Sequence, residues 1–220
     1  MSALIGYVTL DAAHLFTDGG HYHPETIAVS RIGPKVAIIP QHNAAVGFTG
    51  HAFISQALPL YFGQTAEVAD ATDLITRFPD LIKTCVLEMS KIGGPKSWGR
   101  FEMLLAVWSE NGPAAHLLRS DGSNFTYEAV DEFRTPRNPA IDTMSFDPDH
   151  PGPSGLAIMR EQRRQKFGVE SAVSNHRDAL RNMMARPDDR TDAFQVVHGF
   201  CQHTWVDRDG VHSKILERWD

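Results

Sequence analysis

Cysteine is scarce in this sequence, with only Cys85 and Cys201 among 220 residues. A disulfide-stapled scaffold needs more cysteines than this, so the low number favours the reducing cytoplasm. Long hydrophobic runs are also missing, since no apolar stretch approaches the roughly 18 residues that a membrane helix requires. The first ten residues, MSALIGYVTL, lack the basic segment that opens a signal peptide. We therefore expect a cytoplasmic protein with no membrane partner.

Positive charge is in short supply as well. Lys and Arg number 21 against 27 Asp and Glu, which gives a net charge of −6 and an isoelectric point near 6.0. Binding to nucleic acid or to an anionic membrane surface requires a concentrated positive field, so we expect neither partner. Hydrophobic residues make up 42% of the chain, which excludes disorder and leaves a globular protein long enough to bury its own core.

The pattern of apolar residues predicts strands and helices in separate groups. Short apolar runs predict strands at residues 4–10, 12–17, 27–30, 35–39, 44–49, 101–108, 114–119, 124–130, 201–207 and 211–216. Helical spacing predicts helices at 51–62, 74–89, 155–167 and around 175–185. Asn111-Gly112 predicts a hairpin, and Gly19-Gly20 predicts a polar loop through residue 26. Residues 131–153, rich in Pro, Asp and Asn, predict a long loop.

This order of elements favours the α+β class over alternating α/β. Two antiparallel sheets stacked face to face, with a helix pair on each outer side, would bury every apolar face. We therefore expect a four-layer αββα sandwich that forms one domain over residues 1–220. The longest stripe runs from Leu74 to Met89, and Pro79 within it is expected to kink the helix or to begin a new one.

Four features of the first fifty residues stand in a specific order. Ser2 precedes the first strand, Asp18 ends the second strand sixteen residues later, and Lys35 follows Gly33-Pro34 after seventeen more. The segment Gly47-Phe48-Thr49-Gly50 then leads into the first helix. In order and spacing these features resemble the N-terminal-nucleophile hydrolases, in particular the proteasome β subunit and its bacterial relatives. Two later hairpins extend the resemblance over nearly the whole chain.

The resemblance implies a site and a mechanism. Once Met1 is removed, Ser2 would be the nucleophile, and its α-amine, which titrates near about 7.7–8.0, would be the base. Lys35 would lower neighbouring pKa values, Asp18 would hold Lys35, and the Gly47 N–H would be the oxyanion donor. On this basis we expect Lys35→Ala to abolish turnover with thermal stability nearly intact.

Auxiliary roles are implied for three more residues, Ser154, Asp189 and Asp192. The chain departs from the family pattern here, because only Gly-Pro-Ser-Gly surrounds Ser154 and no Ser accompanies the two aspartates. Gly19 and Gly20 also stand where a basic residue often follows the family's Asp.

The resemblance further implies a cytosolic peptidase that needs no cofactor and no metal. Its substrate would be a peptide or another amide, and its partners would be copies of itself in a ring of at least six subunits. The stripe from residue 74 to 89 and the basic residues 160–166 are expected to lie at the subunit contacts. An ATPase partner is conceivable, but nothing in the sequence identifies one.

Other interpretations stay open. The chain could be a non-catalytic assembly or binding protein of the same fold, or a hydrolase of a small amide. His21 and His23 share one strand face and could chelate a metal, although lining a cleft is the simpler role. Cys201 near His203 could be a thiol nucleophile, but a cysteine in the last strand pair is more typical of a core.

Overall fold

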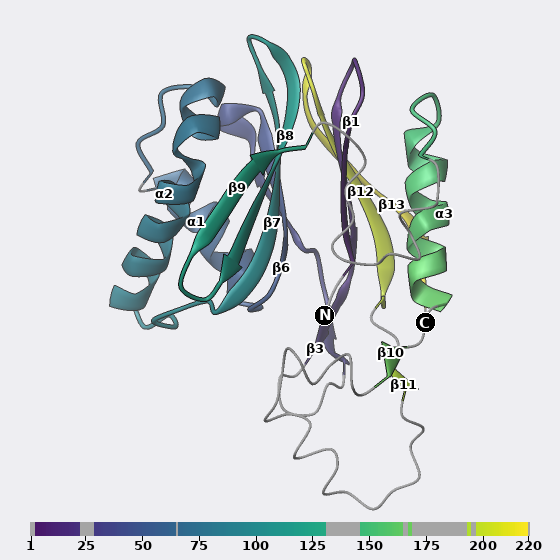
Figure 1. Ribbon diagram of the computed structural model, residues 1–220, viewed down its shortest axis with the longest axis horizontal. Helices are drawn as coiled ribbons and strands as arrows, with labels where there is room; N and C mark the ends of the chain where they lie inside the picture. Colours follow the sequence, from purple (N-terminus) through teal and green to yellow (C-terminus); the bar gives the residue numbers. More distant parts are fainter. Residues whose placement is uncertain are drawn as a thin grey trace, which may run out of the picture.

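The computed structural model describes residues 3–22, 29–64, 66–130, 146–164 and 197–219, together with the backbone of 167–168 and 193–194. Its elements follow the order strands, two helices, strands, one helix and further strands, which confirms the α+β class. Figure 1 shows two main sheets side by side, with helices on their outer sides. Among the described residues, we find no helix whose length and apolar character would let it span a bilayer.

The first main sheet joins the two ends of the chain. Its strands are β1 (Leu4–Val8), β2 (Ala13–Asp18), β12 (Phe200–Asp207) and β13 (Gly210–Arg218). They lie in the order β1-β2-β12-β13, and each neighbouring pair is antiparallel. The second strand of the chain therefore pairs with a strand that begins at residue 200.

The second main sheet has five antiparallel strands in sequence order. They are β5 (Val36–Ile39), β6 (Ala44–Thr49), β7 (Arg100–Ser109), β8 (Gly112–Asp121) and β9 (Phe125–Ala129). Glu110 and Asn111 form the turn between β7 and β8, and Gly112, the first residue of β8, has a φ of 95°. This confirms the hairpin that Asn111-Gly112 predicts, because glycine tolerates the positive φ that follows the turn.

The two main sheets face each other across an apolar layer. Leu4 and Leu15 from the four-stranded sheet pack there with Leu104 and Leu117 from the five-stranded sheet. The sheets approach closely at Gly47, where an added Cβ would lie 2.6 Å from Leu4 Cδ1. β1 therefore packs closely against β6 near the start of the chain.

Helices α1 (Ile54–Gln64) and α2 (Ala71–Lys91) cover the outer face of the five-stranded sheet (Figure 1). Asp70 caps α2 by accepting a hydrogen bond from the Asp73 N–H at 2.8 Å. The helix continues through Pro79, so the expectation that Pro79 begins a new helix is wrong.

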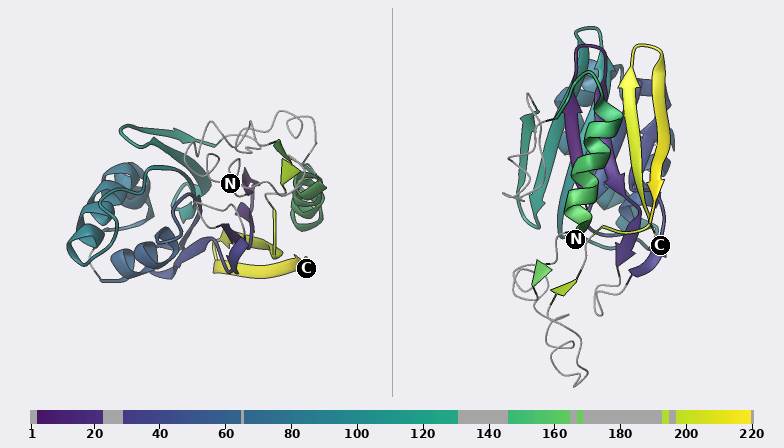
Figure 2. Two further views of the ribbon diagram at one scale, coloured as in Figure 1. Left: turned by 90° about the horizontal axis from the view of Figure 1, so that it is seen from below. Right: turned by 90° about the vertical axis from the view of Figure 1, so that its right-hand side faces the viewer.

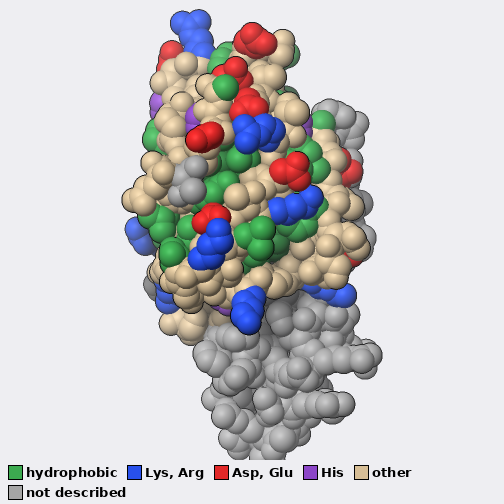
Figure 3. All heavy atoms as spheres, turned by 90° about the vertical axis from the view of Figure 1, so that its left-hand side faces the viewer, with side chains coloured by type: hydrophobic (Ala, Val, Ile, Leu, Met, Phe, Trp, Pro, Cys, Tyr) green, Lys and Arg blue, Asp and Glu red, His purple; other side chains and the backbone are tan. Residues whose placement is uncertain are grey.

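The apolar stripe of α2 belongs to the core of this chain. Leu74, Phe78 and Ile82 are fully buried in the cluster between α2 and the sheet. Figure 3 views the helix side, where hydrophobic atoms are interspersed with charged side chains. Most of the stripe therefore packs inside this chain, and Ile75 and Val86 within it are only partly buried. Its burial between subunits stays a prediction. The ring itself stays a prediction.

Helix α3 (Pro151–Arg164) lies across the outer face of the four-stranded sheet, as Figure 2 shows. Ile158 and Met159 pack there against Ile5 and Phe16. The helix begins within the loop expected up to residue 153, since Pro is favoured in a first helical turn. The second helix expected on this side, around residues 175–185, lies outside the described residues. The helix pair of the four-layer arrangement stays a prediction.

Two basic side chains of α3 form contacts within this chain. Arg160 Nε donates to a carboxylate oxygen of Glu217 at 2.6 Å, and the guanidinium of Arg163 lies 5.5 Å from the ring centre of Trp219. These contacts engage them within the chain. The expectation that the basic residues 160–166 lie at subunit contacts gains no support from them.

Gly155 sets how closely α3 approaches the sheet. A Cβ added there would lie 2.2 Å from the ring of Phe16, whereas a Cβ on Gly63 of α1 would meet nothing within 4 Å. We expect Gly155→Ala to lower the free energy of unfolding by about 1–3 kcal/mol through overpacking. Gly63→Ala should raise it by about 0.5–1 kcal/mol through better helix propensity. Denaturant unfolding of both variants measures these changes in the free energy of unfolding. Equal changes in the two variants would contradict the close packing at Gly155.

Two short strand pairs complete the fold. β3 (Gly20–Tyr22) pairs with β4 (Val29–Ile32), and β10 (Phe167–Gly168) pairs with β11 (Ala193–Phe194). The polar loop expected from Gly19-Gly20 onward is therefore wrong for residues 20–22, since the β4 ladder holds them extended. Of the predicted loop 131–153, residues 131–145 lie outside the described residues.

Candidate active site

The carboxylate of Asp18 lies at the end of β2 and is fully buried. Its Oδ1 accepts hydrogen bonds from Lys35 Nζ at 2.6 Å and from the Ala3 N–H at 3.0 Å. Its Oδ2 accepts from the Gly20 N–H at 2.9 Å and from the His198 N–H at 3.3 Å. A buried charge is costly unless it is paired and hydrogen-bonded, and these four donors meet both conditions.

Lys35 is the cation of this buried pair and is only 2% exposed. It comes directly before β5, and its carbonyl accepts the Phe48 N–H at 3.1 Å. Burial lowers the pKa of Lys35, and the neighbouring Asp18 partly offsets this by favouring the charged form. The sequence prediction that Asp18 holds Lys35 in place is therefore reproduced as a direct ion pair.

The start of the chain is tied to the same oxygen. Because β1 pairs with β2, Ala3 lies beside Asp18, and its N–H and the Lys35 ammonium both bond Oδ1. Ser2 is joined to Ala3 by one peptide bond, and its own placement lies outside the described residues. The ion pair is thus fixed one residue away from the predicted nucleophile.

A segment near the other end of the chain completes the surroundings of Asp18. The His198 N–H bonds the carboxylate, and the His198 carbonyl accepts the Gly19 N–H at 2.9 Å. Gly199 next to it has a φ of 81°, which allows the chain to turn into β12. Sequence reasoning missed this segment, because a backbone amide donates whatever its side chain is.

Two side chains of β3 border the pair. Burial and the charge of Asp18 raise the pKa of Tyr22. Burial lowers the pKa of His21, and the charges of Lys35 and Arg31 lower it further. His21 Nε2 is buried and has no hydrogen-bond partner. His23, the other half of the predicted histidine pair, lies outside the described residues.

Gly47 lies inside β6 rather than in a loop. The neighbouring Phe48 N–H donates to Lys35 on the β5 side. Successive N–H groups of a strand point to opposite sides, so the Gly47 N–H points toward its partner Leu104 on β7. The close approach of Leu4 explains why glycine stands here. A role as oxyanion donor stays a prediction, since it needs this N–H to face the substrate.

The structure does not bring Ser154 to the buried pair. Its Oγ accepts the Asp147 N–H at 2.9 Å, within the turn that begins α3. None of its described hydrogen bonds reaches Asp18 or Lys35. The other two auxiliary candidates, Asp189 and Asp192, lie outside the described residues.

The alternative nucleophile, the Cys201 thiol, has the properties of a core residue. Cys201 is fully buried opposite Asp18 in the β2–β12 ladder, and burial raises the pKa of its thiol to about 12. The thiolate that nucleophilic attack requires is therefore disfavoured at neutral pH. Within the described ranges, no three His, Cys, Asp or Glu side chains are placed to share a metal ion.

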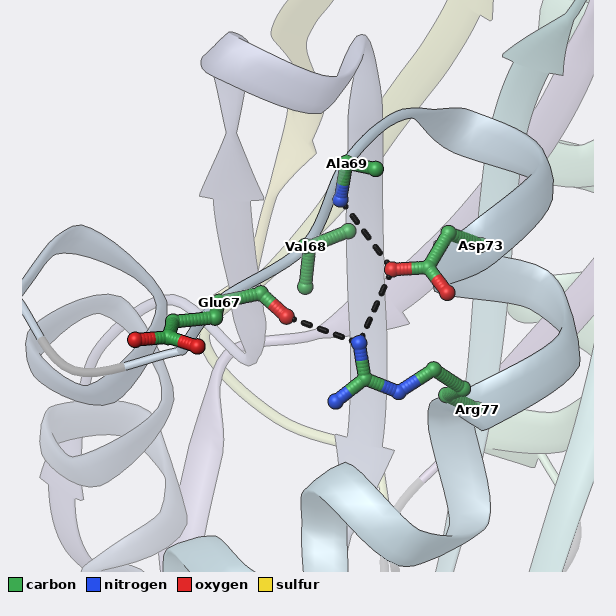
Figure 4. A pocket seen from close by; sticks show the side chains of 5 residues that line it. All are labelled: Glu67, Val68, Ala69, Asp73 and Arg77. Atoms are coloured by element: carbon green, nitrogen blue, oxygen red, sulfur yellow. Dashed lines mark hydrogen bonds and ion pairs between the residues drawn. The ribbon is translucent and has the colours of Figure 1, made fainter.

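Two surface hollows lie away from the pair. One is lined by residues 67–69 with Asp73 and Arg77, and Figure 4 shows Arg77 bonded to the Glu67 carbonyl and to Asp73. Both bonds come from Arg77 Nη1. The other is lined by the β1–β2 turn and by parts of β8 and β9. Neither hollow includes Asp18 or Lys35 in its lining.

The sequence was compared with known proteins. It matches no protein-family model and no curated protein sequence.

Proposed function

We propose that this chain is a proteasome-like N-terminal-nucleophile amidohydrolase of the cytoplasm that uses Ser2 after removal of Met1. One observation carries the proposal. The buried ion pair of Asp18 and Lys35 is bonded to the backbone of Ala3, the residue directly after Ser2. A structural ion pair gains little from burial on its own, whereas a buried cation beside a nucleophile has a chemical use.

The proposed reaction begins at the free amine of Ser2. This amine takes the proton of the Ser2 hydroxyl, and the oxygen attacks the carbonyl carbon of an amide. The positive charge of Lys35 favours the anionic states along this path, and Asp18 fixes the position of Lys35. The amine then returns the proton to the leaving nitrogen. Water hydrolyses the resulting ester by the same route and restores Ser2.

Substrate and assembly belong to the same proposal. A peptide is the preferred substrate, with a smaller amide as the alternative, and the subunits assemble into a homo-oligomeric ring. The non-catalytic alternative is favoured by one specific observation, the direction of the Gly47 N–H toward β7. A chain with that amide held in the sheet would lack this oxyanion donor.

Ser2→Ala is the direct test, because it removes the hydroxyl and still allows removal of Met1. We expect wild-type protein from its own host to have the intact mass of a chain that starts at Ser2. We also expect it to be acylated at Ser2 by a β-lactone probe and to cleave members of a panel of fluorogenic peptide amides. Ser2→Ala should lose both activities, and Ser2→Thr should keep them because it keeps a hydroxyl.

Retention of Met1 would overturn this proposal. The α-nitrogen of Ser2 would then be an amide, which cannot accept a proton near neutral pH. Equal labelling of wild type and Ser2→Ala would overturn it as well. Either result leaves the non-catalytic protein as the better account.

A further inference from the structure

Thr17 places a hydroxyl group in the interior of the fold. The residue is fully buried on β2 and comes directly before Asp18. Within the part of the chain that the structure describes, no group hydrogen-bonds Thr17 Oγ. An unpaired buried hydroxyl costs free energy, whereas valine has nearly the same shape without this cost. A hydroxyl kept at such a position therefore calls for an explanation, and a role in chemistry is one.

The Thr17 side chain lies in the layer between the two main sheets. Thr17 is the ladder partner of Leu4 on β1, so the two side chains share a face. That face looks toward Gly47 on β6, since a Cβ added to Gly47 would lie 2.6 Å from Leu4 Cδ1 and 3.5 Å from Thr17 Cγ2. The partner of Gly47 on β5 is Val36, which directly follows Lys35. Thr17 therefore lies across the layer from the start of β5, where Lys35 enters the site.

The β1–β2 ladder relates the start of the chain to Thr17. The Asp18 N–H donates to the Ala3 carbonyl at 3.4 Å, and the Ala3 N–H donates to Asp18 Oδ1 at 3.0 Å, so the pairing continues to Ala3. The Ala3 nitrogen belongs to the peptide bond that joins Ser2 to Ala3. Side chains two residues apart on a strand share a face. A strand continued from Leu4 to Ser2 would therefore present the Ser2 side chain on the face of Thr17.

We propose that Thr17 is a positioning residue whose hydroxyl orients the nucleophile. This inference rests on the proposed function and adds a residue to its site. In the chain that starts at Ser2, the Thr17 hydroxyl donates a hydrogen bond to Ser2 Oγ. The proton of the Ser2 hydroxyl is then directed at the Ser2 amine, the base of the proposed reaction.

Exchange of the hydroxyl for a methyl group tests this role. We expect Thr17→Val to lower kcat and the rate of labelling by the β-lactone probe about tenfold, the effect of one neutral hydrogen bond, with KM unchanged. Thr17→Ser loses a methyl group that lies near Gly47, so it should unfold at a lower urea concentration. It keeps the hydroxyl and should keep the wild-type kcat. A purely structural role of Thr17 would not produce these opposite patterns.

Thr204 on β12 offers the matched control. It is fully buried, and as the partner of Leu15 it lies on the same face of the sheet as Thr17. Its hydroxyl shares a hydrogen bond of 2.9 Å with Ser213 Oγ. Thr204→Val should therefore unfold at a lower urea concentration than wild type and keep the wild-type kcat. A wild-type kcat in Thr17→Val, or an equal loss of kcat in Thr204→Val, would overturn the positioning role.

Urea unfolding tests the contact without relying on catalysis. In the Ser2→Ala protein no Oγ is left for Thr17 to bond, so adding Thr17→Val should raise the urea midpoint. With Ser2 present, Thr17→Val also breaks the contact and should raise the midpoint less or lower it. All four proteins are compared after their intact mass shows that Met1 is removed. Equal shifts in the two backgrounds overturn the contact and leave the hydrolase standing. Unequal shifts with no cleavage by wild type keep the contact and overturn the hydrolase.

Discussion

Replacing Lys35 with alanine is expected to abolish amide hydrolysis and to lower the free energy of unfolding by about 3–5 kcal/mol. Both partners of the ion pair are buried, with side chains 3% and 0% exposed. Removing the ammonium leaves the Asp18 carboxylate without its cation, and the three backbone N–H donors that remain carry no full charge. The sequence alone predicts an activity loss with nearly intact stability. Because Lys35 is buried, we instead expect a large loss of stability.

Two further variants separate charge from packing. Lys83→Ala breaks an exposed pair with Asp80, whose side chains are 57% and 82% exposed, and should change stability by less than about 0.5 kcal/mol. Asp18→Asn with Lys35→Met removes both charges and should recover much of the lost stability while staying inactive. Urea unfolding and the fluorogenic assay measure these effects. A Lys35→Ala variant that cleaves substrate at the wild-type rate would remove Lys35 from the mechanism.

The second prediction with a large expected effect is a loss of folding stability at acidic pH. His14 on β2 and His203 on β12 are buried, and His14 Nδ1 lies 3.1 Å from His203 Nε2. Thr9 Oγ lies 3.3 Å from His14 Nε2, so both ring nitrogens of His14 are engaged in hydrogen bonds. His203 Nδ1 is buried without a hydrogen-bond partner.

Protonation of this pair is disfavoured in the folded state. Burial lowers the pKa of His14 to about 4, with Asp207 acting weakly in the opposite direction. Burial lowers the pKa of His203 to about 3, and the charges of His14 and Lys214 add to this. Both values lie below the ordinary 6.5, so the unfolded chain binds more protons than the folded chain in this range. The two neutral histidines therefore make their full contribution to the free energy of unfolding above pH 6.5. That contribution falls as the pH drops toward 4.

We expect a loss on the order of 3 kcal/mol from His14 alone between pH 7 and pH 4, at about 1.4 kcal/mol per pKa unit. Phe at both positions keeps a ring of similar shape and removes both titrating groups. The variant with His14→Phe and His203→Phe should therefore lose most of this acid dependence. His51→Gln changes an exposed histidine and should keep the wild-type acid dependence of stability. Unfolding in urea at pH 7 and at pH 4.5 gives the comparison, and an unchanged acid loss in the double variant would contradict the assignment.

The sequence predicts local structure well where spacing alone decides it. Short apolar runs place β1 and β2, and the stripe from Leu74 to Met89 identifies the buried face of α2. Such a stripe shows that a face is buried but not what covers it, and in this chain the five-stranded sheet covers most of it. The 20–22 strand was missed because Gly-Gly signals a loop unless a partner strand holds it, and β4 does so here.

The candidate site was predictable only in part, for a similar reason. The pairing of Asp18 with Lys35 was implied by the resemblance, which the order and spacing of the two residues carry. The donor at His198 lies 180 residues from Asp18 and acts through its main chain, so residue type gives no signal for it. The contact of His14 with His203 spans 189 residues, and only the strand order β1-β2-β12-β13 brings the two rings together.

That strand order has a consequence for synthesis on the ribosome. The β1–β2 hairpin is made first, yet one edge of β2 waits for β12, which begins at Phe200. Until then β2 has an unpaired edge, which is the kind of surface that associates with other chains. Asp18 also lacks its His198 donor during this time. The charged pair can therefore reach its final arrangement only after nearly the whole chain has been translated, so that a stalled nascent chain carries no assembled site.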